Sequence, residues 1–133
     1  MPGRALGVMT SQSCGETLQL LYIATTVSQH LFIATIPCIL TAVTYRIRVG
    51  SSSGTFQIVK CPTGTAPANG TVITSAIDIS ATPTADTTLT AALTVGNNSS
   101  NVTLNTGDSL AVVIGGTMTS GVGLIQLFVE PVS

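Results

Sequence analysis

The stretch Val43-Thr44-Tyr45-Arg46-Ile47-Arg48-Val49 alternates strictly between apolar and polar side chains. In a β-strand, the apolar residues at the odd positions would lie on one side and the polar residues at the even positions on the other. This period of two is typical of a strand with one face in the core and one face in solvent. The stretch therefore predicts a half-buried β-strand.

The residues that follow predict a β-hairpin. Gly50–Gly54 has the composition of a flexible turn, and a second apolar stretch runs from Thr55 to Lys60. Pairing the two stretches across this turn would place Ile47 opposite Phe56, so that both apolar faces coincide. We expect the two strands to be neighbours in one sheet.

Short apolar stretches separated by turn residues continue to the C-terminus. They are Val72–Thr74, Ala76–Ile79, Asp86–Val95, Val102–Leu104, Leu110–Ile114 and Leu124–Val129. Ala85–Ala92 has a second interpretation, as a short helix. Together with the earlier stretches they make about eight or nine strands, which predicts an all-β fold: an antiparallel β-sandwich, jelly-roll-like.

The first residues of the chain have a different composition. They contain Pro, Gly and polar residues without any periodicity, which predicts an extended N-terminal arm at 1–17 ahead of a single β-sandwich domain at 18–133. Such an arm is either a frayed terminus or a segment that lies on a neighbouring subunit. The apolar side chains of Leu6, Val8 and Met9 favour the neighbouring subunit.

Charged residues are rare in this chain. They make up 7% of its 133 residues, whereas an ordinary soluble domain carries about 25%. Four cations spread along the chain are too few to neutralise a run of phosphates, so we expect no nucleic-acid partner. The formal net charge of −1 leaves little to keep copies apart, which favours association with copies of itself or with a larger scaffold.

Residues 17–45 require a test for a membrane span, because they include no formally charged residue and are long enough to cross a bilayer. The polar triplet Ser28-Gln29-His30 and Pro37 divide the stretch into pieces of strand length. Buried β-strands fit this pattern better than a transmembrane helix. We therefore expect no membrane partner.

Catalytic and metal-binding patterns are absent from the sequence. The three cysteines, Cys14, Cys38 and Cys61, show no paired metal-ligand spacing, and they are interpreted as small buried hydrophobes. His30 is the only histidine, and no nucleophile motif accompanies it. The predictions are that the protein is not an enzyme and that it uses no metal or other cofactor.

Arg46 and Arg48 share the polar face of the first strand described above. They belong either to a solvated outer face or to a contact with acidic or carbonyl groups of a partner subunit. The candidate partner contacts are therefore these two arginines together with Leu6, Val8 and Met9.

Several loop motifs resemble those of a group of small β-rich structural proteins of tailed bacteriophages, which include head decoration, head fibre and minor virion proteins. The shared pattern begins with a Lys and a Thr-Gly-Thr loop, continues through an Asn-Gly turn, and closes with Leu-x-x-Gly-Asp-x-Leu and a Gly-rich connection. In this chain the matching segments are Val59-Lys60, Thr63-Gly64-Thr65, Asn69-Gly70, Leu104–Leu110 and Gly116–Gly123. The resemblance covers roughly residues 30–129.

The resemblance implies a decoration (cement) protein on the virion surface, assembled in the cytoplasm of the host bacterium. Its partners would be the major capsid protein and copies of itself, as a homotrimer that clamps capsomer junctions. The alternative is a receptor- or glycan-binding module of a phage head fibre or tail. A third interpretation is a coat protein built only of this domain. The family supplies no catalytic residue to carry over.

Overall fold

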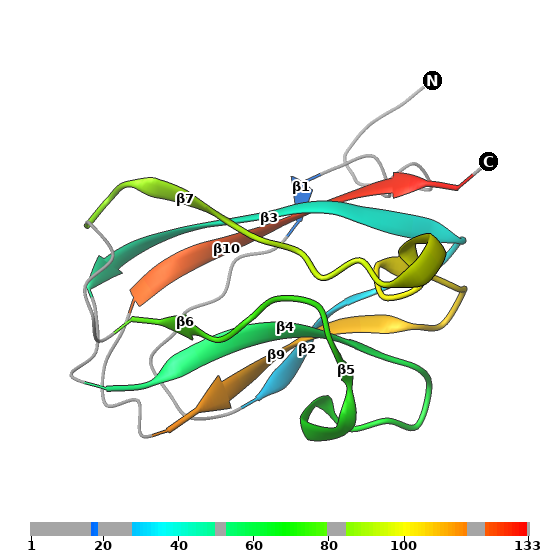
Figure 1. The fold of residues 1–133 in the computed structure, drawn as a ribbon, viewed down its shortest axis with the longest axis horizontal. Coiled ribbons are helices and arrows are strands. Elements are labelled where there is room, and N and C mark those ends of the chain that lie inside the picture. Colours follow the sequence, from blue (N-terminus) through cyan, green and yellow to red (C-terminus); the bar gives the residue numbers. More distant parts are fainter. Residues whose placement is uncertain (1–16, 19–27, 50–52, 80–84, 117–121, 133) are drawn as a thin grey trace.

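The computed structural model describes residues 17–18, 28–49, 53–79, 85–116 and 122–132. These residues form β-strands and two short 3-10 helices (Figure 1). In chain order the elements are β1 (Thr17–Leu18), β2 (Gln29–Ile33), β3 (Cys38–Val49), β4 (Thr55–Cys61), η2 (Pro67–Asn69), β5 (Thr71–Val72), β6 (Ile77–Asp78), β7 (Thr88–Ala91), η3 (Asn97–Ser99), β8 (Thr103–Leu104), β9 (Ser109–Gly115) and β10 (Val122–Pro131).

The strands form two five-stranded antiparallel sheets that pack face to face (Figure 1). Sheet A has the order β1-β10-β3-β7, with β8 also paired to β3. Sheet B has the order β2-β9-β4-β5, with β6 also paired to β4. The prediction of an all-β antiparallel sandwich is confirmed.

The strand order is that of a jelly roll. Strands from the two halves of the chain pair from the outside inward: β1 with β10, β2 with β9, β3 with β7 and β8, and β4 with β5 and β6. The chain is thus one long antiparallel ribbon that doubles back after β4. Rolling up this ribbon adds the β10–β3 and β9–β4 pairs and divides the strands between two sheets.

The core lies between the two sheets and is almost entirely aliphatic. Sheet A and sheet B both contribute side chains that are at most 2% exposed, among them Val43, Ile47, Ile125 and Leu127 from sheet A and Phe56, Ile58, Leu110 and Val112 from sheet B. A second, smaller cluster of Val59, Cys61 and Ala111 lies on the outer face of sheet B.

The alternation of residues 43–49 gives β3 one buried face and one exposed face, as predicted. In β3, Val43 and Ile47 are buried, whereas Arg46 and Arg48 are exposed on the outer face of sheet A. The Thr-rich stretch 86–95 contains strand β7, so its interpretation as a strand holds and the helical alternative is wrong. The side chain of Val49 lies outside the described residues.

The predicted hairpin between 43–49 and 55–60 is wrong, because β3 belongs to sheet A and β4 to sheet B. Tyr45 and Phe56 instead meet across the core, with ring centroids 5.6 Å apart in an edge-to-face arrangement. Two alternating strands joined by a short loop can bury their apolar faces side by side in one sheet or face to face in two. The apolar pattern is the same in both cases and does not distinguish them.

The predicted arm lies outside the described residues except for Thr17. This residue begins β1 and pairs with Phe128 at the edge of sheet A. No helix in the described part of the chain is long and apolar enough to cross a membrane.

Candidate functional site

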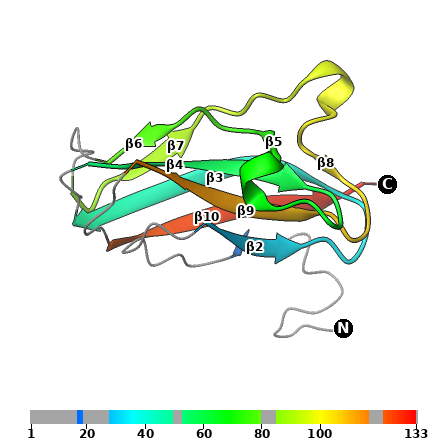
Figure 2. The ribbon, with the colours of Figure 1, turned by 90° about the horizontal axis from the view of Figure 1, so that it is seen from below.

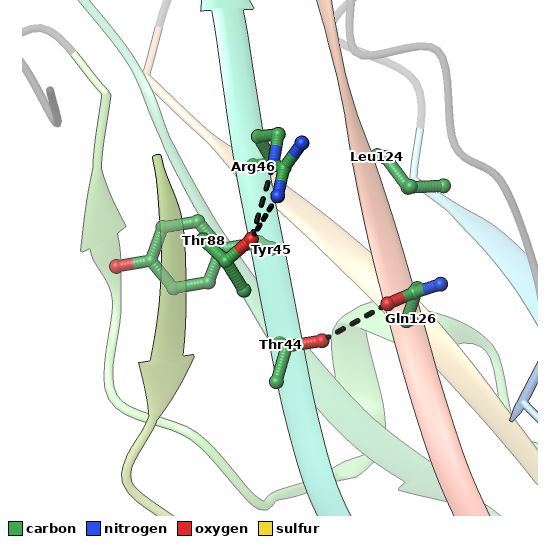
Figure 3. Close-up of a pocket in the computed structure, with 6 residues that line it drawn as sticks. All are labelled: Thr44, Tyr45, Arg46, Thr88, Leu124 and Gln126. Atoms are coloured by element: carbon green, nitrogen blue, oxygen red, sulfur yellow. Dashed lines mark hydrogen bonds between the residues drawn. The ribbon is translucent and has the colours of Figure 1, made fainter. Parts of the chain in front are cut away.

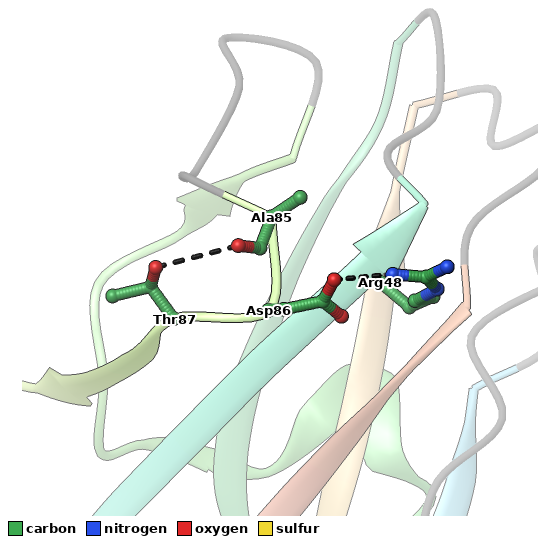
Figure 4. A network of polar contacts seen from close by, with 4 residues as sticks. All are labelled: Arg48, Ala85, Asp86 and Thr87. Atoms are coloured by element: carbon green, nitrogen blue, oxygen red, sulfur yellow. Dashed lines mark hydrogen bonds and ion pairs between the residues drawn. The ribbon is translucent and has the colours of Figure 1, made fainter.

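The two predicted arginine contacts lie on the outer face of sheet A, and both have partners within the chain. The guanidinium of Arg46 donates from Nε and Nη2 to the Thr88 hydroxyl, at 3.0 and 2.5 Å (Figure 3). Arg48 forms an ion pair with Asp86, and these side chains are 69% and 48% exposed (Figure 4). An ion pair this exposed stabilises the fold by at most about 1 kcal/mol.

Arg46 borders a shallow hollow of about 210 Å³ that crosses β10, β3 and β7 (Figure 3). Next to it, the Thr44 hydroxyl donates to the Gln126 side-chain carbonyl at 3.3 Å, and Leu124 supplies an apolar wall. The polar groups of the hollow are thus hydroxyls, an amide and one guanidinium. Leu6, Val8 and Met9, the other predicted contacts, lie outside the described residues.

A larger hollow of about 600 Å³ opens at one end of the sandwich, and we call it the end groove. It is lined by His30 and Ile33 of β2, by residues 61–66 at the end of β4 and in the loop that follows, and by Gly107 and Ser109 around the start of β9. Ile33, at the rim, is 62% exposed, which is high for a large aliphatic side chain. The groove therefore combines small side chains, backbone groups and one exposed apolar residue.

His30 and Ser109 meet in the end groove although they are 79 positions apart in the chain. The His30 Nδ1 lies 2.7 Å from the Ser109 hydroxyl, and this hydroxyl lies 3.5 Å from the Cys61 carbonyl oxygen. Ser109 can accept a hydrogen bond from His30 while donating one to Cys61. The hydroxyl of a side chain that is only 5% exposed thus has partners on both neighbouring strands.

The acid nearest to Ser109 along the chain is Asp108, and its carboxylate is placed differently from the acid of a catalytic triad. Asp108 precedes Ser109, but its carboxylate accepts the backbone N–H of Asn105 at 2.9 Å and closes the turn there. Gly107, with φ of +95°, gives this turn its tight geometry. Within the described ranges no group of three His, Cys, Asp or Glu side chains could hold a metal ion.

Cys61 lies beneath the loop that borders the end groove. Its thiol faces the Ala66 carbonyl oxygen at 3.9 Å. Burial raises the pKa of the Cys61 thiol, and the nearby Ser109 side chain only partly offsets this. A thiol with a raised pKa is mostly protonated at neutral pH and is a poor nucleophile, which supports the interpretation of Cys61 as a buried hydrophobe.

Two of the loop motifs found in the sequence come together at the end groove. Thr63, in the Thr-Gly-Thr loop, donates its hydroxyl to the carbonyl oxygen of Gly107, in the Gly-Asp turn, at 3.3 Å. Sequence reasoning identified both motifs but missed Ser109 and Ile33. Their position depends on the pairing of β2 with β9, which no local pattern reveals.

Replacing Gly70 with alanine is expected to destabilise the protein by about 1–3 kcal/mol. The added Cβ would lie 2.8 Å from both the Cys61 sulfur and a Val59 methyl, so the loop over sheet B must shift. We expect chemical denaturation to show the loss, and peptide mapping after thiol labelling to show faster modification of Cys61.

Gly64→Ala in the same loop is the matched control. Nothing lies within 4 Å of its added Cβ, so it tests backbone strain at φ +90° without a steric clash. Equal labelling of Cys61 in both variants would contradict the packing of the loop against this thiol.

Comparisons of the chain with protein-family models, with curated proteins and with solved structures found no match. The function must therefore be inferred from the jelly-roll architecture, from the polarity of its surfaces and from the loop motifs gathered at the end groove.

Proposed function

We propose that the protein decorates the capsid of a tailed bacteriophage and stabilises its capsomer junctions as a cement. The observation that supports this most directly is the meeting of two phage-like loop motifs, through Thr63 and Gly107, at one end of a jelly roll. The two motifs are separate stretches of the sequence. Their contact makes them parts of one surface, as expected if they serve one role.

The distribution of charge supports association with a protein surface. Several of the few charged side chains have partners within the chain. Arg48 pairs with Asp86, Asp108 accepts a backbone N–H of its own turn, and Lys60 donates to two backbone carbonyls. The Lys60 ammonium donates to Ser100 at 2.6 Å and to Thr103 at 3.1 Å, which ties β4 to the other sheet. Covering such a surface requires little desolvation of unpaired charge.

A cement protein acts by burying surface against several subunits at once. A contact of standard size removes about 1,600 Å² from water. If the protein is a trimer, it makes several such contacts together, and each one raises the effective concentration for the next. Rigid strands with hydroxyl-bearing surfaces are suited to this purpose, because binding orders few long side chains.

A receptor- or glycan-binding module is the second candidate. It is favoured by the hollow on sheet A, where Thr44, Arg46 and Gln126 offer hydroxyl, guanidinium and amide groups of the kind that bind sugar hydroxyls. The Tyr45 ring, however, packs against Phe56 rather than forming an aromatic platform. Binding of the purified protein to host cells or to a glycan array, abolished by Arg46→Ala, would support this candidate over the first.

Heating virions with and without the protein tests the proposal. A cement that binds only the intact shell stabilises it, so virions that lack the protein are expected to release DNA at a lower temperature. Adding back the purified protein should restore the release temperature, and electron cryomicroscopy should show its density at capsomer junctions. Unchanged DNA release, or density confined to fibre tips, would contradict the proposal.

A further inference from the structure

We propose that residues 1–16 of one copy add a strand to the free edge of β2 in a second copy, and place apolar side chains in its end groove. The inference concerns contacts between copies of this chain. It is independent of the proposed attachment to a capsid and can be tested on the purified protein alone.

No described strand lies beyond β2 at its edge of sheet B. Among the described residues, β2 pairs only with β9, and Figure 2 shows it at the border of its sheet. It is five residues long, whereas the other outermost described strands have two residues (β1, β5, β6 and β8) or four (β7). An edge strand presents unpaired backbone groups that act as a template for another strand.

The sequence of β2 has neither charge nor proline to protect its edge. Natural monomers protect such strands with charged side chains, proline or β-bulges. Gln29-His30-Leu31-Phe32-Ile33 has a register shift against β9 between His30 and Phe32, but it contains no charged residue or proline and ends on an aliphatic residue that is 62% exposed. With respect to the described residues, the strand therefore combines an outer edge that has no strand partner with an exposed apolar side chain.

The end groove provides space for side chains beside this edge. Ile33 stands at its rim, and Pro62, Ala66 and Gly107 contribute walls without long side chains. Its volume of about 600 Å³ lies within the range of pockets that hold ligands. A strand added along β2 would run past this opening and could insert apolar side chains there.

Residues 1–16 have the composition to fill this site. No formally charged residue lies between Arg4 and Glu16, and the apolar residues Leu6, Val8 and Met9 are concentrated in the middle. Leu6 and Val8 are two positions apart, so in a strand they would lie on the same face. This pattern matches an edge that offers backbone hydrogen bonds and one apolar hollow.

The length of the segment and the charge of the chain favour a second copy as the acceptor. Sixteen extended residues reach roughly 50 Å, beyond the ~30 Å diameter of a small domain. A net charge of −1 gives two copies little mutual repulsion. Passing the segment head to tail from copy to copy closes a ring when the rotation between copies closes, and a trimer is one such ring.

Sedimentation of the purified full-length chain tests the inference. The native chain is expected to be an oligomer, and Ile33→Asp or the double change Leu6→Asp with Val8→Asp is expected to produce monomers. Val95→Asp is the control, because Val95 is 45% exposed but does not line the end groove. A monomeric native chain, or an oligomer that survives both changes, overturns the inference.

Disulfide trapping separates exchange between copies from folding back, and does not depend on the aspartate variants folding. Chains carrying Val8→Cys and chains carrying Ile33→Cys, both with Cys14→Ser and with different tags, are mixed and oxidised. A disulfide between differently tagged chains supports the inference. A disulfide that forms only when one chain carries both changes shows that the segment covers its own β2, and overturns it.

Discussion

Replacing Phe56 with alanine is expected to lower the free energy of unfolding by about 3–5 kcal/mol. The Phe56 ring is fully buried in β4 and packs edge to face against Tyr45 of the opposite sheet. The change removes apolar area from the core, leaves a cavity, and breaks an aromatic pair worth about 0.5–1.5 kcal/mol. Urea denaturation followed by circular dichroism measures the loss. Because single domains are stable by only about 5–15 kcal/mol, this change brings the protein close to unfolding at room temperature.

Val72→Ala is the control for this prediction. Val72 lies in the same sheet but is 44% exposed, so its truncation should change the stability by less than about 0.5 kcal/mol. Similar losses in the two variants would mean that Phe56 is not packed between the sheets, which would contradict the sandwich.

Replacing Thr74 with valine is expected to destabilise the protein by about 1–3 kcal/mol, although the two side chains have nearly the same shape. Thr74 is 1% exposed, and its hydroxyl accepts the backbone N–H of Ile58 at 3.0 Å. Ile58 lies between the parts of β4 that pair with β5 and with β6, so this hydroxyl replaces a missing strand partner. Valine would leave a buried N–H without its acceptor.

Thr74→Ser separates the hydrogen bond from the packing. Serine keeps the hydroxyl and loses one methyl group, so its cost should be near 0.8 kcal/mol. A melting series in which valine is tolerated better than serine would contradict the assigned role of the hydroxyl.

The fold class was predictable from local patterns, but the strand partners were not. Alternation in 43–49 identifies the buried and exposed faces of β3, because side chains in a strand alternate whatever lies next to it. Partners depend on which strands approach in space, and in a rolled ribbon most of them are distant in sequence. For this reason Ile47 and Phe56 were placed in one sheet when they belong to two.

The candidate site was predictable only in part, for the same physical reason. Loop motifs such as Thr63–Thr65 are local and were found, and so was the exposed position of Arg46. The bond from His30 to Ser109 depends on β2 lying beside β9, and the contact of Thr63 with Gly107 on β4 lying beside β9. The local sequence of these strands does not indicate which strand each one pairs with.

The position of β10 has a consequence for synthesis on the ribosome. This strand, Val122–Pro131, is made after all the other described strands, yet it lies between β1 and β3 inside sheet A. Sheet A therefore cannot close until β10 has been synthesised, and the earlier strands wait with an open gap between them. Folding dominated by such distant pairings is slow and exposes strand edges to aggregation. A nascent chain stalled before Val122 should accordingly be sensitive to protease throughout.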